Sequence, residues 1–459
     1  MTQTITKKLN DKWYLRWAAL LLISSMMFFA YMFVDVMSPL MSMIESSHNW
    51  NSETFGTYAS SEYFLNVFVF FLIFAGIILD KMGIRFTGLL SSALMVIGAL
   101  IKLYAISDYF VGTGLEAWLN SWWVELPASA KLASLGFMIF GCGCEMAGTT
   151  VSKAIAKWFQ GKEMALAMGM EMAIARLGVF AVMWISPLIA EKYDMSVLAP
   201  VAFCTLLLII GLMNYTIFSL MDKRFDKQIA AEGKTTEQTS DEEFQLKDLG
   251  KIFSSKMFWL VALLCVLYYS AIFPFQRYAP NFLETTLQVD ATTAARLFSC
   301  FPILAMVLTP FLGAFLDLVG KGATMLMVGA VIMITCHLSF AFLLPIYPSP
   351  WLALVLIVTL GVSFSLVPAA LWPSVPKIID EKILGSAYCV IFWIQNIGLC
   401  LVPLLIGKVL NVTGSYVMPM VIFSLFGVLA FVMSLLLRIE DGRKNYGLEK
   451  PNIKKKKEE

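Results

Sequence analysis

The 459-residue sequence has few charged side chains and almost no histidine. Asp, Glu, Lys and Arg together make up 14% of it, and its two histidines, His48 and His337, lie far apart. Neither histidine stands in an H-x-x-x-H or G-x-S-x-G context, and no Walker phosphate-binding loop is present. The sequence therefore predicts no metal site, no nucleophile–base pair and no ATP hydrolysis. We expect neither an enzyme nor a bound cofactor.

The eight cysteines also carry no recognisable chemistry. All fall within apolar runs, which indicates buried thiols rather than a disulfide framework.

Apolar side chains, by contrast, are abundant. They make up 59% of the sequence, whereas soluble domains have about 45–50%. A water-soluble core of this length could not bury so many. The fold class predicted is an all-α membrane protein.

Twelve hydrophobic segments are each long enough to cross about 30 Å of hydrocarbon. We expect spans at approximately 17–42, 55–79, 87–106, 132–157, 163–190, 197–221, 257–282, 293–316, 323–344, 351–374, 387–409 and 416–438. The first run is too long for a cleavable signal core, so we expect it to be retained.

Lysine and arginine cluster in alternate connections and in both terminal segments, which places those segments in the cytoplasm by the positive-inside rule. The predicted organisation is a cytoplasmic N-terminus (1–16), a six-helix bundle (17–221), a cytoplasmic linker (222–256), a second six-helix bundle (257–438) and a basic cytoplasmic tail (439–459). An outer insertion (108–131) holds three tryptophans and is expected to lie at the membrane interface or to bind another protein.

A G-x-x-x-D-x-x-G pattern occurs twice, each time after the second span of a half. Its members are Gly76, Asp80 and Gly83, followed by Arg85, and Gly313, Asp317 and Gly320. We expect the glycines to permit close helix approach and a tight turn. We expect each aspartate to meet a helix N-terminus or a base from the opposite half, in a contact that breaks as the cytoplasmic side opens.

Two opposite charges fall near the predicted midplane. Glu145 and Arg176 each lie about a dozen residues from the basic turn at 157–162, at about 1.5 Å per residue. An unpaired charge there costs at least roughly 2.5–3.5 kcal/mol, so such residues pair, line a cavity or bind a ligand. We interpret the two as a substrate site, with a purely structural ion pair as the alternative. Glu171 is a weaker candidate.

Further polar groups lie in the outer half. Asp35 and Glu62, with Tyr58 and Asn66, are predicted to form an outer gate or a proton site, or alternatively to hydrogen-bond between helices. Arg277 and Arg296 are expected to reach the lipid headgroups, with a second anionic contact at Arg277 as the alternative.

The duplicated loop, the twelve spans and the central linker resemble the major facilitator superfamily, whose two bundles rock around a midplane site. Ile84 and Leu318 depart from that family, which often has a basic residue there.

Longer blocks are similar to the lysosomal dipeptide transporter branch of that superfamily. They are residues 141–178, 268–275, 370–375 and 394–398. The resemblance implies movement of dipeptides, with Glu145 and Arg176 holding the two ends of a zwitterion. A carboxylate suits an ammonium group, and the planar fork of Arg binds a carboxylate bidentately. Residues expected to line the second half of the cavity are Tyr268, Tyr269, Trp372, Gln395 and Asn396.

The function expected is a secondary-active or facilitative carrier of dipeptides or similar zwitterions, a uniporter or a proton symporter. Alternatives are a carrier of the same fold for another organic ion and a transport-dead receptor or scaffold. The expected partners are a small-molecule substrate, protons in the symporter case and the lipid bilayer, with no nucleic acid. Neither terminal segment shows an acidic dileucine signal, so we expect a cell membrane, bacterial in the first instance, rather than a lysosome. An accessory subunit like that of the lysosomal branch is not expected.

Overall fold

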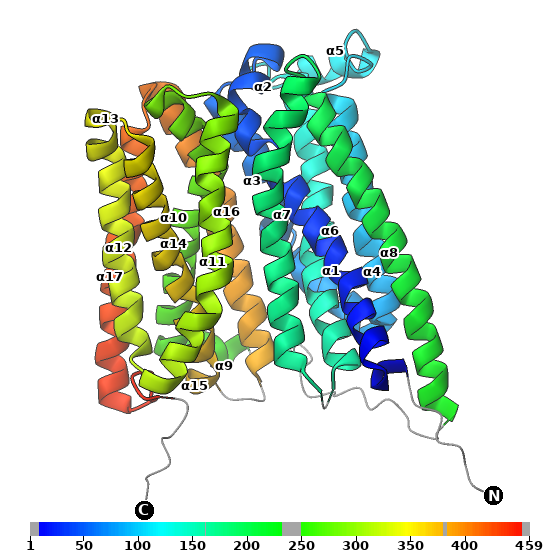
Figure 1. Ribbon diagram of the computed structural model, residues 1–459, viewed down its shortest axis with the longest axis vertical. Coiled ribbons are helices and arrows are strands. Elements are labelled where there is room, and N and C mark those ends of the chain that lie inside the picture. The colour runs from blue at the N-terminus through cyan, green and yellow to red at the C-terminus, as the bar shows by residue number, and fades with distance from the viewer. Residues whose placement is uncertain (1–8, 161, 232–248, 380–382, 452–459) are drawn as a thin grey trace, which may run out of the picture.

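The computed structural model describes residues 9–160, 162–231, 249–379 and 383–451. All regular elements in these ranges are helical, and they form two bundles standing side by side (Figure 1). The first bundle comprises α1 (Trp13–Asp35), α2 (Met41–His48), α3 (Ser52–Phe68), α4 (Phe71–Ala105), α5 (Gly114–Asn120), α6 (Ala128–Trp158), α7 (Met164–Lys192) and α8 (Leu198–Ala231). After α9 (Leu249–Ser254), the second comprises α10 (Lys256–Leu287), α11 (Ala291–Val319), α12 (Gly322–Leu338), α13 (Leu344–Ile346), α14 (Pro350–Ala370), α15 (Val375–Ile378), α16 (Leu384–Thr413) and α17 (Val417–Lys444).

Eleven helices in the described residues are long and apolar enough to cross a membrane. The second predicted span, 55–79, is the one without a counterpart among them. Its first part, α3, is 17 residues long and stops where Phe70 takes a left-handed conformation with φ 56°. Its second part begins α4, which bends at Gly83 and continues as the third span. The second predicted span thus falls on α3 and the start of α4, and no proline or glycine at 68–70 indicates the break in the sequence.

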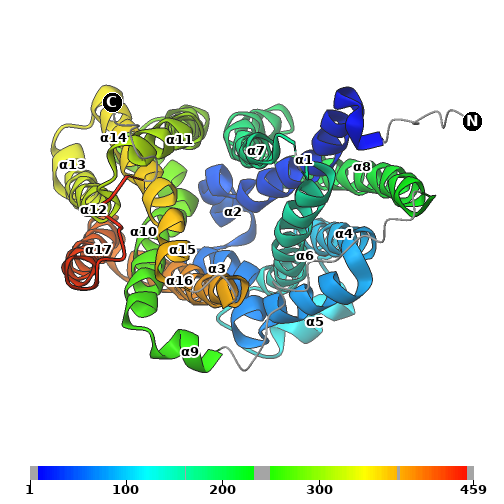
Figure 2. The same ribbon diagram turned by 90° about the horizontal axis from the view of Figure 1, so that it is seen from below.

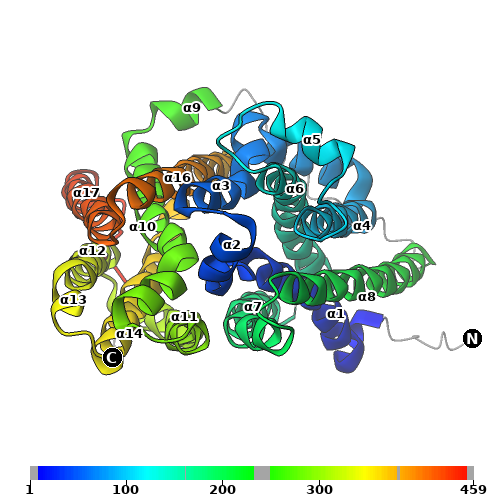
Figure 3. The ribbon, with the colours of Figure 1, turned by 90° about the horizontal axis from the view of Figure 1, so that it is seen from above.

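The bundles meet along two pairs of helices. α3 packs against α16 and α7 packs against α11, as both end-on views show (Figures 2 and 3). The approach of α3 to α16 requires Gly56, because a Cβ atom there would lie 2.5 Å from the Pro403 carbonyl oxygen. Inside the first bundle, a Cβ atom on Gly141 of α6 would lie 1.9 Å from the Glu62 carbonyl oxygen of α3. These contacts fix the helices that carry the central charges.

The two ends of the molecule differ in how the bundles are joined. We call the end at which α5 lies the insertion end, and the end at which α8 stops and α10 begins the linker end (Figure 1). Polar contacts between the bundles gather toward the insertion end. They include Trp184 with Ser299 (2.9 Å), Ser42 with Glu284 (2.9 Å), Asn411 with Glu53 (3.1 Å) and Thr292 with Glu191.

At the linker end, ion pairs join helices of one bundle. Lys153 pairs with Asp80 at 2.5 Å, and Lys157 and Arg85 both pair with Asp222, at 2.8 and 3.0 Å. The expected pairing of Asp80 with a base from the opposite half is therefore wrong for this conformation.

The two loop motifs share a backbone turn but differ in packing. Gly83 and Gly320 have φ of 74° and 75°, which confirms the expected tight turns. Cβ atoms on Gly76, Gly83 and Gly313 would meet nothing within 4 Å, so the expected close helix approach is wrong at these positions. At Gly320, a Cβ atom would lie 2.6 Å from the Glu449 carbonyl oxygen.

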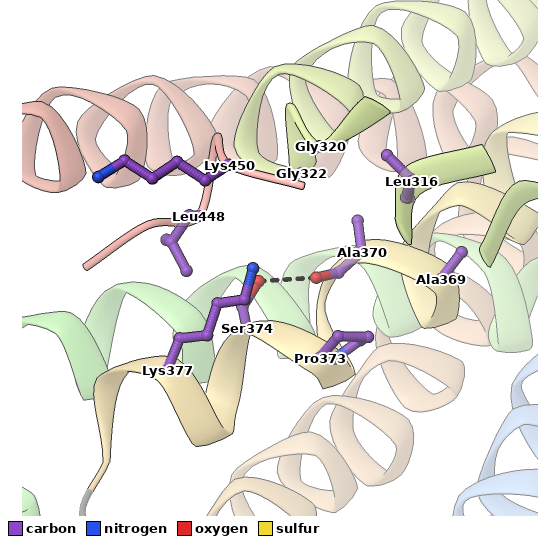
Figure 4. A pocket seen from close by; sticks show the side chains of 10 residues that line it. All are labelled: Leu316, Gly320, Gly322, Ala369, Ala370, Pro373, Ser374, Lys377, Leu448 and Lys450. Carbon is purple, nitrogen blue, oxygen red and sulfur yellow. Dashed lines mark hydrogen bonds between the residues drawn. The ribbon is translucent and has the colours of Figure 1, made fainter. Parts of the chain in front are cut away.

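That oxygen belongs to the segment after α17, residues 445–451, which lies against the second loop. The Lys321 and Gly322 amides donate to the carbonyls of Glu449 and Leu448, each at 3.0 Å. The Glu449 carboxylate accepts from the Thr324 amide at 2.8 Å, so it caps the N-terminus of α12. Leu448 and Lys377 line a small pocket beside this contact (Figure 4).

These helices also refine the expected segment boundaries. α8 runs to Ala231, into the predicted linker, and residues 232–248 of that linker lie outside the described residues. The predicted insertion contains α5, and α6 begins at Ala128. α17 extends to Lys444, into the predicted tail, and residues 452–459 lie outside the described residues, as do 1–8 of the N-terminal segment.

Candidate functional site

Glu145 and Arg176 lie midway along α6 and α7, and both are half-buried. No ion pair joins them in the part of the chain that the structure describes. The structural alternative, in which the two side chains bridge one another, is therefore not the arrangement of this conformation. Neither charge has an ion-pair partner among the described residues.

Each of the two charges meets an uncharged residue of the second bundle. Asn396 of α16 is 2% exposed, and its amide lies close enough to interact with the Glu145 carboxylate. Within the described residues, the Asn396 Nδ2 atom has no hydrogen-bond partner of ordinary geometry. The Arg176 guanidinium lies over the Phe364 ring of α14, with Cζ 5.0 Å from the ring centroid. The first bundle thus contributes the charges and the second an amide and an aromatic face.

Phe364 belongs to an aromatic group on α10 and α14. Tyr269 stacks on Phe273 at 5.4 Å between centroids, and both rings meet Phe364 edge-on. The Trp372 Nε1 atom donates to the Tyr269 hydroxyl at 3.2 Å. The structure thus brings predicted residues Tyr269 and Trp372 together beside Arg176, whose charge acts on Tyr269.

A polar stripe on α6 runs from Glu145 toward the linker end. Thr149, Ser152 and Lys153 are exposed and follow Glu145 at the spacing of one helix face. A stripe of this polarity faces water rather than lipid.

Tyr31 of α1 is a common neighbour of the central charges. Its hydroxyl lies near enough to Arg176, Glu171 and Glu145 to interact electrostatically with each of them. Glu171 is 7% exposed and has no hydrogen-bond or ion-pair partner among the described residues. The weaker sequence candidate thus lies close to the two stronger ones.

A second charged cluster lies nearer the insertion end. Arg277 of α10 forms ion pairs with Asp35 of α1, at 3.4 Å, and with Glu62 of α3. It also donates to the Val34 carbonyl, and the Gln276 Nε2 atom donates to Asp35 at 2.7 Å. All of these contacts cross from the second bundle to the first.

The expectation that Arg277 reaches the headgroups is wrong, and its alternative, an anionic contact, is made with two carboxylates of the protein. The Arg277 side chain is 9% exposed, because two buried carboxylates hold it inside the protein. Arg296 lies over the Trp184 ring of the first bundle, with Cζ 4.8 Å from the centroid. Both bases serve the contact between bundles.

Comparison with known proteins decides the family. The model of the Major Facilitator Superfamily matches residues 23–403. The chain belongs to the major facilitator superfamily. It is a multi-pass membrane transporter rather than an enzyme, as the family and its relatives are.

The curated relatives that match are all named lysosomal dipeptide transporter MFSD1. The Danio rerio protein is 29% identical over 92% of this chain and 86% of its own length. The Gallus gallus protein is 31% identical over 70% of each chain.

Among solved structures, the D-xylose-proton symporter matches with a TM-score of 0.68, 13% identity and coverage of 92% of this chain and 97% of its own. The nucleoside transporter NupG matches with a TM-score of 0.64, 15% identity and coverage of 92% of this chain and 98% of its own. At such identities these structures support the superfamily fold alone.

Three predicted residues form no hydrogen bond with the residues of either site in the part of the chain that the structure describes. The Tyr268 hydroxyl donates to the Leu326 carbonyl of α12, inside the second bundle. The Gln395 Oε1 atom accepts from the Cys265 thiol at 3.3 Å, also inside that bundle. Asn66 is fully buried, and neither of its amide atoms has a hydrogen-bond partner among the described residues. Residues adjacent in sequence to a site residue, such as Tyr268 and Gln395, fall on another helix face.

Sequence reasoning missed one charged residue of the superfamily core, Lys102 of α4. It is fully buried, and its Nζ atom lies 4.2 Å from the ring centroid of Phe33 and 5.1 Å from those of Tyr58 and Phe137. Tyr58, a predicted gate residue, stacks on Phe137 at 4.7 Å. Lys102 could have been found as an ionisable residue inside the predicted span 87–106.

Proposed function

We propose that this transporter moves dipeptides or similar small zwitterions by alternating access. The carrying observation is that Glu145 and Arg176 lie half-buried in the core without an ion pair between them. In the proposal, Glu145 binds the ammonium group of the substrate and Arg176 binds its carboxylate. The names of the curated relatives support the substrate class.

Neutral residues of the second bundle complete the proposed site. Asn396 would share the ammonium with Glu145, and Phe364 would hold the Arg176 guanidinium in place by a cation–π contact. Tyr269 and Trp372 would then lie beside the peptide side chains. Closure of the second bundle over a ligand held by the first would couple binding to movement.

The proposed outer gate is the contact of Arg277 with Asp35 and Glu62. In this conformation the contact seals the insertion end, and it has to separate when that end opens. Glu62 is also the proposed proton site in the symporter case. Proton coupling predicts that a pH gradient alone drives accumulation of alanyl-alanine in proteoliposomes, and that Glu62→Gln abolishes this accumulation.

For location, we propose that the linker end faces the cytoplasm of a cell whose surface membrane holds the protein. The alternate basic connections support the orientation. The relatives' name includes the word lysosomal, so a lysosomal membrane is the competing assignment. Fractionation of the source cells with a membrane marker for each compartment decides between the two.

The decisive experiment pairs altered ligands with altered residues. Alanyl-alanine should raise the melting temperature of the purified protein, because a ligand at 100 times its Kd adds about 2.7 kcal/mol of stability. N-acetyl-alanyl-alanine lacks the ammonium, and alanyl-alanine amide lacks the carboxylate. Acetylation should weaken binding to the natural protein but not further weaken binding to Glu145→Gln. Amidation should likewise weaken binding to the natural protein but not further weaken binding to Arg176→Gln.

Other outcomes select the alternatives. Stabilisation by ligands of a single charge that needs Arg176 and not Glu145 would favour a carrier of another organic ion. Absence of counterflow for every solute tested, with a partner protein captured through residues 108–131, would favour the receptor or scaffold.

A further inference from the structure

Lys102 presents a problem of charge and hydrogen bonding. Its side chain is 0% exposed, and its Nζ atom has no hydrogen-bond partner among the described residues. Three aromatic rings, from α1, α3 and α6, surround the ammonium group. Rings attract a cation but satisfy none of its three N–H donors. A buried ammonium in this arrangement has given up its hydration without regaining hydrogen bonds.

The acids that could supply those bonds are close by. The Lys102 charge acts on both Asp35 and Glu62, the two carboxylates that Arg277 holds in this conformation. The Phe137 ring contacts both cations, since the Arg277 Cζ atom lies 5.7 Å from its centroid. The two bases thus lie against the same ring and act on the same pair of acids.

The two bases belong to different bundles. Lys102 lies on α4, in the same bundle as Asp35 of α1 and Glu62 of α3, whereas Arg277 lies on α10 of the other bundle. Separation of the bundles at the insertion end would remove Arg277 from its two acids. Removing one partner of a buried ion pair is strongly destabilising because the other charge is left uncompensated.

We propose that Lys102 is a replacement counter-ion, which takes over Asp35 and Glu62 when Arg277 withdraws. This inference rests on the proposed alternating access and adds a positioning residue to the outer gate. In the closed form the Lys102 ammonium lies among its three aromatic rings while Arg277 is paired with both carboxylates. In the open form its ammonium reaches the carboxylates of its own bundle and forms the hydrogen bonds that it lacks here.

Every charged or titratable group that faces Lys102 fits this exchange. Asp35 and Glu62 are the acids exchanged, and Arg277 repels Lys102 in the closed form. Cys204 of α8 and Tyr58 of α3 are the remaining titratable neighbours. Neither is an alternative carboxylate.

The test substitutes Lys102 by methionine, which keeps the length of the side chain and removes the unsatisfied ammonium. Because the closed form does not use that ammonium in a hydrogen bond, Lys102→Met should melt at the same temperature as the natural protein or higher. Its thermal stabilisation by alanyl-alanine should persist. Counterflow of alanyl-alanine in proteoliposomes should slow about tenfold, equivalent to 1.4 kcal/mol. Lys102→Arg should recover much of the rate.

A second readout needs no substrate. Backbone hydrogen exchange, followed by mass spectrometry at residues 184–191 and 292–299, reports opening of the insertion end where the bundles meet. Lys102→Met should slow this exchange, whereas Arg277→Met should speed it. In a Glu62→Gln background, Lys102→Met should have a smaller effect, because one acid no longer needs a counter-ion.

The outcomes separate this inference from the proposed function. Unchanged counterflow and unchanged hydrogen exchange in Lys102→Met would overturn the counter-ion role. A parallel fall in melting temperature and counterflow would show a structural role only. Failure of alanyl-alanine to stabilise the natural protein would count against the dipeptide proposal, while the hydrogen-exchange test of Lys102 would still stand.

Discussion

The two bundles share a fold but divide the chemistry of the centre between them. The first bundle supplies Glu145 and Arg176, whereas the second supplies the amide of Asn396 and the ring of Phe364. In the proposed mechanism, keeping the charges in one bundle would let a zwitterion bind there before the other bundle closes. Because Asn396 and Phe364 are uncharged, their approach does not require the desolvation of a further buried charge.

The same division appears in the duplicated loops. The first loop is held by side-chain ion pairs, such as Asp80 with Lys153, and its turn glycine Gly83 has an open surrounding. The second is held by backbone hydrogen bonds that Lys321 and Gly322 donate to Glu449 and Leu448, and residues 449–451 fill the space around Gly320. The duplication has therefore preserved the turn and changed what fastens it.

The largest expected effect comes from Arg277, where the second bundle does carry a charge into the first. Arg277→Met removes the base that pairs with Asp35 and Glu62, and breaking a buried pair in this way costs about 3–5 kcal/mol, of which the proposed pairing with Lys102 would recover a part. Thermal unfolding of the purified protein should show a correspondingly large loss. Arg296→Met is the matched control, because Arg296 lies over the Trp184 ring and is in no ion pair of the described residues. Equal losses in the two variants would contradict the gate.

The loop comparison predicts a smaller but still measurable difference between two identical substitutions. Gly83→Ala and Gly320→Ala both force a side chain into positive φ, at a cost of about 1–3 kcal/mol each. Gly320→Ala must also displace the backbone of Glu449 and Lys450, so it should lower the melting temperature further. Truncation after Lys444 provides the control, because it should remove the extra penalty at 320. A larger loss at 83 would show that the second loop is not fastened by residues 448–449.

The aromatic support of Arg176 predicts a change in affinity rather than stability. Phe364→Leu removes a cation–π contact worth about 0.5–2 kcal/mol, so affinity for alanyl-alanine should fall about two- to thirtyfold. Phe273→Leu is the control, since that ring stacks on Tyr269 and is not the ring beneath Arg176. Isothermal titration of both variants measures the effect, and equal affinities would assign Phe364 to packing.

The sequence foretold the all-helical membrane fold because long apolar runs have no other stable form in a bilayer. It also singled out Glu145 and Arg176, because charges at that depth are costly unless they are used. It could not reveal the break at Phe70, since φ there is set by packing and not by a glycine or proline. Nor could it place Arg277, which turns inward only because Asp35 and Glu62, far away in sequence, meet it there.

The smallest expected effect concerns the exposed pair of the first loop. Asp80 and Lys153 are 34% and 45% exposed, and such pairs are worth about 0–1 kcal/mol. Asp80→Asn should therefore change the melting temperature little. If this pair holds the first loop in the present conformation, Asp80→Asn should still alter the rate of counterflow, and added salt should reduce the difference from the natural protein. Asp441 offers the contrast in the second half, because its carboxylate accepts from the buried Leu448 amide at 3.1 Å. Asp441→Asn should lower the stability of the protein with little dependence on salt. If this variant is as sensitive to salt as Asp80→Asn, the two loops are held by the same kind of contact.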